Sequence, residues 1–322
     1  MRALTVTGFG GPEVLKVREV DTPSPGPGEI TIDVSHAAVG LIDALLRRGD
    51  FRDAPGLPRP PYTPGLEVAG TVREIGAGVT GLRPGEVVAT LTLPGMGGLA
   101  EVVAAPAPLV APLGGTVPPE QGAAALGNAA TAHLALGAAH LRPGERVLVH
   151  GVTGALASVF PAVAAALGAA EVVGTVRRPE RIAAAEELGL DRAVLSSDFP
   201  GAIADARFDV VVDPVGGELR RRSPEVLNRY GRLLVVGDAS GEDVALSTDL
   251  IWQRAIGVIG FNVGAVLAED PTRGAAAGRA VLPLLADGRL RLPVTTAPLA
   301  DAADTFARFE RGAIGGRLLL IP

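Results

Sequence analysis

Residues 147–157 read Val147-Leu148-Val149-His150-Gly151-Val152-Thr153-Gly154-Ala155-Leu156-Ala157, an apolar run followed by a turn that contains glycine. A short apolar run of this kind is typical of a buried parallel strand. The turn leads into an alanine-rich helical stretch, so its free N–H groups and the positive helix end are suited to a dinucleotide pyrophosphate. The expected contacts are Gly151, Thr153, Gly154, Ala155 and Leu156.

The turn matches the pattern G-x-G-x-x-G/A only in part, because Val152 stands at the first glycine position. Gly154 and Ala157 fit the second and third positions. Pro161 predicts a lost hydrogen bond and a kink inside the following helix. Taken alone, the motif leaves an ordinary strand-to-helix turn equally open.

The next apolar run, residues 171–176, ends in Arg177 and Arg178, and Arg181 follows one helical turn later. A site that prefers NAD carries an acidic residue here for the ribose 2′-hydroxyl. No acid stands at this strand end, and guanidinium groups suit a 2′-phosphate. The pattern favours a 2′-phosphate site and therefore NADPH. The alternative is that these arginines are only solvent-exposed residues at the start of a helix in an arginine-rich chain.

Strands and helices alternate along the chain from about residue 118 onward. This alternation predicts an α/β fold with a doubly wound parallel sheet. The expected elements are strands at 146–150, 171–176, 209–213 and 232–237 and a helix at 179–188.

The first 118 residues have a different texture, with short β-like runs broken by glycine and proline. Five prolines stiffen the loop 52–64 and exclude helix there. After about residue 256 the pattern is mixed, with helices expected at 272–287 and 300–310 and a last strand at 316–321. The simplest organisation is a β-rich domain interrupted by the α/β domain and completed by the C-terminal segment.

Composition narrows the function classes. The chain has 322 residues, 48% of them hydrophobic and 20% charged, with a net charge of −6. A mildly acidic chain without a basic stripe is not expected to bind nucleic acid or an anionic membrane. With no cysteine, disulfides, thiolate metal sites and cysteine nucleophiles are excluded. We expect a soluble cytoplasmic protein with a small-molecule substrate, because no signal peptide or membrane span is evident.

A set of motifs along the whole chain resembles the zinc-independent quinone oxidoreductases, a branch of the medium-chain dehydrogenase/reductase superfamily that includes zeta-crystallin. The resemblance implies a GroES-like catalytic domain from residues 1–118 and 259–322, a Rossmann domain from 119–258, and NADPH in the cleft between them. It also implies a homodimer built through the sheet edge near residues 256–264. The matching stretches are Phe9–Lys16, Pro25–Glu29, Pro61–Gly65, Gly76–Val79, Leu141–Gly151, Asp213–Gly217, Gly231–Gly237 and Gly316–Leu320.

Zinc ligands of the related zinc enzymes are replaced in this chain. Gly40 stands for a ligand cysteine and Leu66 for a ligand histidine, and only Glu67 remains. One carboxylate cannot hold a catalytic zinc, which needs three protein ligands. The four histidines show no ligand spacing, so no metal is expected.

Three positions depart from the family pattern. Ala155 carries a Cβ where the family has glycine beside the phosphates, Gly40 replaces a frequent asparagine, and Ser196 replaces a tyrosine that contacts the cofactor. Arg181 matches a lysine of the family at the 2′-phosphate. These departures raise the question of whether NADPH binding or turnover is weakened.

The resemblance also implies the residues near the reacting atoms. Tyr62, in the proline-rich loop, is the first candidate hydrogen-bond donor to the substrate, with a packing role equally open. Asn128 and Thr131 share one helix face and match a segment beside the nicotinamide, and capping by Asn128 is the alternative. Asp43 is expected to be structural, and Trp252 and Phe261 are expected in the core. The strand-end residues expected to border the nicotinamide are Gly237, Asp238, Phe261 and Asn262.

The leading hypothesis is a zinc-independent, NADPH-dependent reductase of quinones or of enone or enoyl double bonds, including polyketide-type intermediates. It needs only alignment of donor and acceptor and polarisation of the acceptor carbonyl. The alternative is a non-redox descendant of this fold that binds, cyclises or dehydrates a small molecule.

Overall fold

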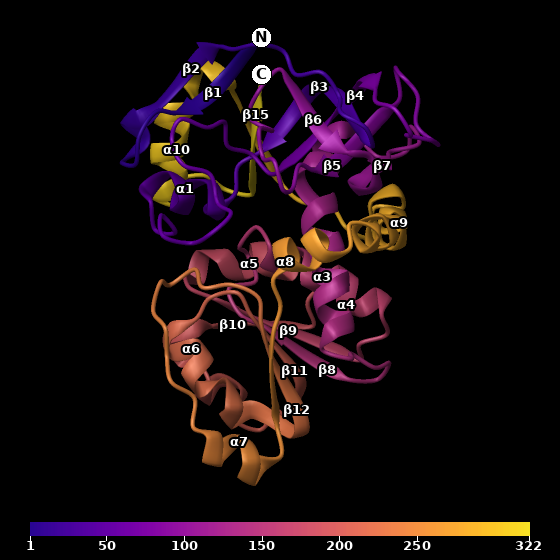
Figure 1. Cartoon of the computed structure of the whole chain (residues 1–322). Helices are drawn as coiled ribbons and strands as arrows, with labels where there is room; N and C mark the ends of the chain where they lie inside the picture. The colour runs from indigo at the N-terminus through magenta and orange to yellow at the C-terminus, as the bar shows by residue number, and fades with distance from the viewer. The chain divides into compact units, whose positions relative to one another are not determined.

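The computed structural model describes residues 1–322, and the chain divides into two compact units. The first, here called the catalytic domain, combines Met1–Gly127 with Val266–Pro322, and the second, the nucleotide domain, is Asn128–Ala265. In Figure 1 the indigo start and the yellow end of the chain meet in the catalytic domain.

Both divisions fall later in the chain than the sequence predicts. Residues 119–127 belong to the catalytic domain because their helical turns pack against three of its strands, β4 (Glu67–Ile75), β5 (Val87–Leu91) and β15 (Arg317–Ile321). Strand β13 (Gly257–Gly260) is still part of the parallel sheet of the nucleotide domain, so the chain leaves that domain only after it.

The catalytic domain is built on a seven-stranded sheet with the order β14-β15-β3-β4-β5-β7, in which β6 also pairs with β3. Its core lies where aliphatic side chains of β1, β3, β4 and β15 pack against Phe306 of α10. Strands β1 and β2 form a separate pair. The strands are β1 (Arg2–Val6), β2 (Leu15–Glu19), β3 (Glu29–Ala38), β4 (Glu67–Ile75), β5 (Val87–Leu91), β6 (Val102–Pro106), β7 (Val110–Pro112), β14 (Val294–Pro298) and β15 (Arg317–Ile321).

Few helices cover this sheet. The loop between α1 and β4 contains no helix, as its prolines predict. The helices of the catalytic domain are α1 (Leu41–Arg48), α2 (Pro119–Gln121), the π-helix η3 (Gly122–Leu126), α9 (Thr272–Ala286), α10 (Ala302–Glu310) and the 3-10 turns η1 (Pro12–Val14), η2 (Ala107–Leu109) and η9 (Leu299–Asp301), and α8 (Val263–Glu269) crosses the domain boundary.

The nucleotide domain contains a six-stranded parallel sheet with the order β10-β9-β8-β11-β12-β13. This is the strand order of dinucleotide-binding folds, with the crevice for a ligand where the order reverses, between β8 and β11. The expected α/β doubly wound class is confirmed. The strands are β8 (Arg146–Val149), β9 (Glu171–Val176), β10 (Arg192–Leu195), β11 (Phe208–Asp213), β12 (Leu227–Val235) and β13.

The sheet strands are apolar because helices pack on them, and their core includes Leu148, Val173 and Val211. The helices are α3 (Gly127–Ala138), α4 (Phe160–Ala166), α5 (Ile182–Glu186), α6 (Gly217–Arg222), α7 (Thr248–Arg254) and the 3-10 turns η4 (Ala157–Val159), η5 (Pro179–Arg181), η6 (Ser196–Asp198), η7 (Gly201–Ile203) and η8 (Ser223–Val226).

Two expectations about single residues are wrong. Pro161 lies in the first turn of α4, where a missing N–H removes no hydrogen bond of the α-helix. Trp252, expected in the core, is 77% exposed on α7.

Candidate functional site

The glycine turn connects β8 to the 3-10 turn η4 and presents its backbone at the carboxyl end of the sheet. The N–H groups of Thr153, Ala155 and Leu156 make no hydrogen bond within the chain. These three donors are therefore free for an anionic ligand. The N–H of Gly151 is not, because it donates to the Thr175 hydroxyl at 3.1 Å.

The departures of the turn from the glycine pattern are accommodated by its neighbours. Val152 is fully buried, and its side chain occupies the space that Gly174 of β9 leaves open. A Cβ on Gly174 would lie 2.6 Å from Cγ1 of Val152. Ala155 adopts no positive φ, so its Cβ causes no backbone strain. The turn can therefore have valine at the first glycine position, because Gly174 on the next strand has no side chain and leaves room for it.

The arginines expected at the 2′-phosphate follow β9 directly. Arg177 is exposed. Arg178, the residue before η5, and Arg181, the last residue of η5, are half-buried. None of the three forms a salt bridge. Three positive charges without an internal counter-ion are available to an anion.

The remaining predicted cofactor contacts lie at the same edge of the sheet. Gly237 and Asp238 follow β12, and Phe261 and Asn262 follow β13. The strand ends are in register, because Asp213 of β11 pairs with Val235 and Val235 with Gly260.

A buried ion pair holds the loop after β12. The Asp213 carboxylate accepts hydrogen bonds from the Val215 and Gly216 N–H groups and from Nε of Arg220 at 2.6 Å. Arg220 also donates to the carbonyl of Gly237. This pair therefore fixes the position of the Gly237 carbonyl through Arg220.

Asn128 and Thr131 lie on α3, one turn apart, as expected. Asn128 Nδ2 donates to the carbonyl of Ala155 at 3.4 Å, and the Ser158 hydroxyl donates to the same oxygen at 3.1 Å. Asn128 thus contacts the glycine turn.

Tyr62 of the catalytic domain is held by its backbone, which exchanges both hydrogen bonds with Val6. Its side chain is half-buried, and its hydroxyl is enclosed and has no hydrogen-bond partner. Burial and the negative charge of Asp43 raise the pKa of Tyr62 to about 12, against the opposing effect of Arg47. The hydroxyl therefore stays protonated and is a donor.

Asp43 is buried on α1 and joins two loops. Its carboxylate accepts from the N–H of Gly40 at 2.8 Å and of Gly65 at 2.9 Å. Burial raises the pKa of Asp43 to about 6, although these hydrogen bonds and Arg317 act in the opposite direction. The residue ties the start of α1 to the start of β4.

Residues at the positions of the zinc ligands of related enzymes have structural roles in this chain. Gly40 caps α1 through Asp43. Glu67 is buried and bound to the guanidinium of Arg317, which also donates to the carbonyls of Ala124 and Val39. No group of three or more His, Cys, Asp or Glu side chains in the chain could hold a metal ion.

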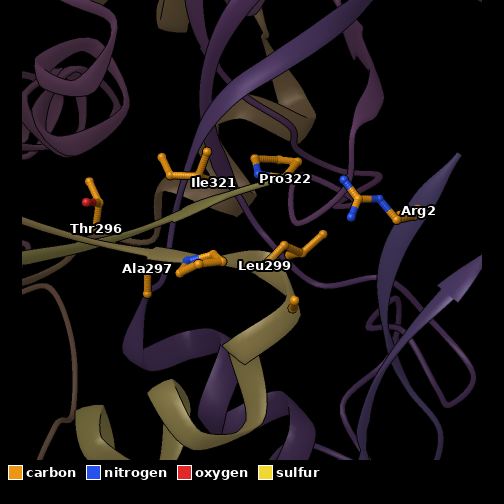
Figure 2. Close-up of a pocket in the computed structure, with 8 residues that line it drawn as sticks. Arg2, Thr296, Ala297, Leu299, Ile321 and Pro322 are labelled. Carbon is orange, nitrogen blue, oxygen red and sulfur yellow. The ribbon is translucent and has the colours of Figure 1, made fainter.

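A pocket of about 480 Å³ lies elsewhere in the catalytic domain, along β14 and the end of β15 (Figure 2). It contains none of the predicted site residues. The residues that line the pocket are Arg2, Thr296, Ala297, Pro298, Leu299, Ala300, Ile321 and Pro322.

No helix of the chain is long and apolar enough to cross a bilayer.

The sequence interpretation missed His150, Thr175 and Arg317. His150 and Thr175 are polar residues at the ends of two adjacent apolar strands, a signal that was available. Arg317 pairs with Glu67, which lies 250 positions away, and no local sequence pattern predicts a pair at that distance.

The fold and the glycine turn define a medium-chain dehydrogenase/reductase. Two family models match the chain, "Alcohol dehydrogenase GroES-like domain" over residues 26–115 and "Zinc-binding dehydrogenase" over residues 155–277. Quinone oxidoreductase of Lama guanicoe is 33% identical over 245 residues, which cover 74% of this chain and 73% of that protein. The chain belongs to the quinone oxidoreductase branch of this superfamily, and it is an oxidoreductase.

Solved structures agree over the whole chain. Quinone oxidoreductase of Pseudomonas syringae pv. Tomato DC3000 has a TM-score of 0.89 at 28% identity, covering 100% of this chain and 99% of that one. Quinone oxidoreductase of Escherichia coli, solved in complex with NADPH, has a TM-score of 0.86 at 25% identity and covers 100% of both chains.

Proposed function

We propose that the protein is a zinc-independent, NADPH-dependent reductase of quinones or of enone or enoyl double bonds. The observation that carries the proposal is the set of arginines after β9, which form no internal ion pair, together with the absence of an acid directly after the strand, where Arg177 stands. The Escherichia coli relative, whose structure contains NADPH, supports it.

The residues at the sheet edge suit the pyrophosphate and the 2′-phosphate of this cofactor. The free N–H groups of Thr153, Ala155 and Leu156 would hold the pyrophosphate, and Arg177, Arg178 and Arg181 the 2′-phosphate. When bound, NADPH supplies a hydride to an electron-poor carbon of the acceptor. The nucleotide domain contributes orientation and charge, and its residues transfer no proton in this proposal.

Tyr62 would donate a hydrogen bond to the carbonyl oxygen of the acceptor. Its hydroxyl has no internal partner and remains protonated at neutral pH, because its pKa is about 12. A donor at an oxygen that gains negative charge stabilises the transition state more than the ground state. Asn128 and Thr131 would complete the nicotinamide side of the site.

The cofactor proposal is tested by fluorescence titration with NADPH and NADH. Removing the three guanidinium groups together (Arg177→Ala, Arg178→Ala, Arg181→Ala) should weaken NADPH binding about tenfold or more and leave NADH binding unchanged. Arg207→Ala removes a cation elsewhere in the domain and serves as the control. If the wild-type protein shows no saturable NADPH binding, a non-redox function replaces this proposal.

The acceptor class is tested by NADPH consumption with quinones, 2-alkenals and enoyl thioesters. Tyr62→Phe should lower kcat about a hundredfold with the best acceptor, with little change in KM. Tyr230→Phe, at an exposed tyrosine, is the matched control. An unchanged kcat would show that Tyr62 is a packing residue.

We further propose a homodimer formed through the free edge of β13. This strand ends the sheet, and large exposed side chains gather around it: Tyr230 and Trp252 are 74% and 77% exposed, and Val258 is 41% exposed. The Tyr230 N–H donates to the Ala255 carbonyl beside α7, which places Tyr230 near this edge.

Analytical ultracentrifugation tests the homodimer. The wild type should sediment as a dimer and the variant Val258→Lys as a monomer, and a monomeric wild type would contradict the proposal.

A further inference from the structure

We propose that Thr175 and His150 position the two phosphate subsites of the nucleotide domain relative to each other, and thereby set the preference for NADPH. This inference rests on the proposed cofactor. Both residues are polar, fully buried and located at the ends of adjacent strands. Neither is expected to touch the dinucleotide, so both are positioning residues.

Thr175 is bonded to the glycine turn at two points. Its carbonyl accepts from the N–H of Val152 at 2.9 Å, and its hydroxyl accepts from the N–H of Gly151 at 3.1 Å. Arg177 follows only two residues later, directly after the end of β9. A displacement of Thr175 would therefore move the turn and the arginine cluster at once.

His150 holds the Thr175 hydroxyl from the other side. Nδ1 of the imidazole lies 3.2 Å from the Thr175 hydroxyl oxygen, and Nε2 lies 2.9 Å from the Ser223 hydroxyl oxygen. The ring edge also packs against Phe199 with centroids 4.8 Å apart. The imidazole thus bridges the turn region and η8.

The proton arrangement of this relay follows from its ends. Ser223 donates its single hydroxyl proton to the carbonyl of Leu219 at 2.7 Å, so it accepts from Nε2–H of His150. Nδ1 is then the acceptor for the Thr175 hydroxyl proton. Burial lowers the pKa of His150 to about 4, so the neutral ring that this arrangement needs is present at neutral pH. Every polar side-chain atom of the relay has a partner.

The alternative is that the relay is an ordinary buried network that only stabilises the fold. The two readings differ in one measurable quantity, the ratio of the NADPH to the NADH dissociation constants. A loss of stability alone leaves this ratio unchanged, because both cofactors bind the same folded population. A moved arginine cluster changes NADPH binding more than NADH binding.

The test compares Thr175→Val with Thr175→Ser and Thr90→Val. Thr175→Val removes the acceptor for Gly151 and the donor to His150, and it should weaken NADPH binding about tenfold and reduce the NADPH preference. Thr175→Ser keeps the hydroxyl and should restore both. Thr90→Val removes a buried hydroxyl that donates to the Leu91 carbonyl in the catalytic domain, and it should leave both dissociation constants unchanged.

The outcomes separate the two proposals. No saturable NADPH binding by the wild type overturns the proposed cofactor itself. Wild-type binding with an unchanged preference in Thr175→Val overturns only the positioning role, whatever happens to Tm. Nitrogen-15 NMR of His150 gives a readout independent of cofactor: the wild type should show a neutral ring protonated at Nε2, and a ring protonated at Nδ1 would contradict the relay.

Discussion

Each domain contains a fully buried titratable side chain whose pKa lies well away from its usual value, Asp43 in the catalytic domain and His150 in the nucleotide domain. Burial favours the neutral form of both, so it raises the pKa of the carboxyl and lowers that of the imidazole. Their surroundings differ. Two backbone N–H groups of loops face Asp43 and suit its charged form, whereas hydroxyl groups face His150 and suit the neutral ring.

The difference indicates two degrees of preorganisation. The relay around His150 is complete within the chain, which fits a domain that must present a finished cofactor site. Beside Asp43, the hydroxyl of Tyr62 and two nitrogens of the buried Arg47 guanidinium have no partner, although Arg47 also bonds to Glu310 at 2.6 Å. The catalytic domain therefore contains hydrogen-bond donors without a partner in the chain, as expected of a domain whose donors bind a substrate.

The largest expected effect comes from breaking the buried ion pair of the catalytic domain. Arg317→Met leaves the Glu67 carboxylate buried without its guanidinium, so the free energy of unfolding should fall by about 3–5 kcal/mol. Urea unfolding measures this loss. Arg73→Met removes an exposed partner of Asp33 and should cause no measurable change. Equal effects of the two variants would mean that burial of the Arg317 pair does not matter.

The next prediction is that the two domains respond to acid in opposite directions. His150 has its folded-state pKa lowered from 6.5 to about 4, so the stability it contributes above pH 6.5 is lost as the pH falls to 4. Asp43 has its pKa raised from 3.8 to about 6, so its contribution is present below pH 4 and is lost as the pH rises to 6. Each change is about 3 kcal/mol.

Amide hydrogen exchange between pH 4 and pH 7 measures this difference, because it reports β8 and β4 separately. Asp43→Asn should remove the pH dependence of the catalytic domain only, and His150→Gln that of the nucleotide domain only. A common response of both domains to either variant would break the comparison.

The smallest effect is expected at the contact between Val152 and Gly174. Gly174→Ala puts a Cβ against a stiff, β-branched side chain and should cost about 1–3 kcal/mol. Val152→Ala in the same chain should recover part of the loss. Gly201→Ala, at a position with no neighbour within 4 Å, is the control, and Tm is the measurement. A loss that Val152→Ala does not relieve would place the strain elsewhere.

Much of the fold could be predicted from local patterns. The strand 171–176 and the helix beginning at Thr272 have the expected positions, because apolar runs and helical periodicity depend on neighbouring residues. The turn at 151–157 was identified for the same reason.

What could not be predicted depends on pairs distant in sequence. Val152 departs from the glycine motif, and the motif alone cannot show that Gly174, on another strand, makes room for its side chain. Trp252 was expected inside because a large aromatic residue usually is, and nothing in the sequence marks the surface on which it lies. The Glu67–Arg317 pair spans nearly the whole chain.

The pairing of β15 with β3 has a consequence for synthesis of the protein. Ala37 and Ala38 pair with Leu320 and Leu319, which leave the ribosome only after the whole nucleotide domain. The nucleotide domain is continuous and can fold while translation continues. Strand β6 can already pair with Glu29–Asp33 of β3, but the Ala37–Ala38 end of that edge stays unpaired until β15 is synthesised, which is an aggregation hazard during translation.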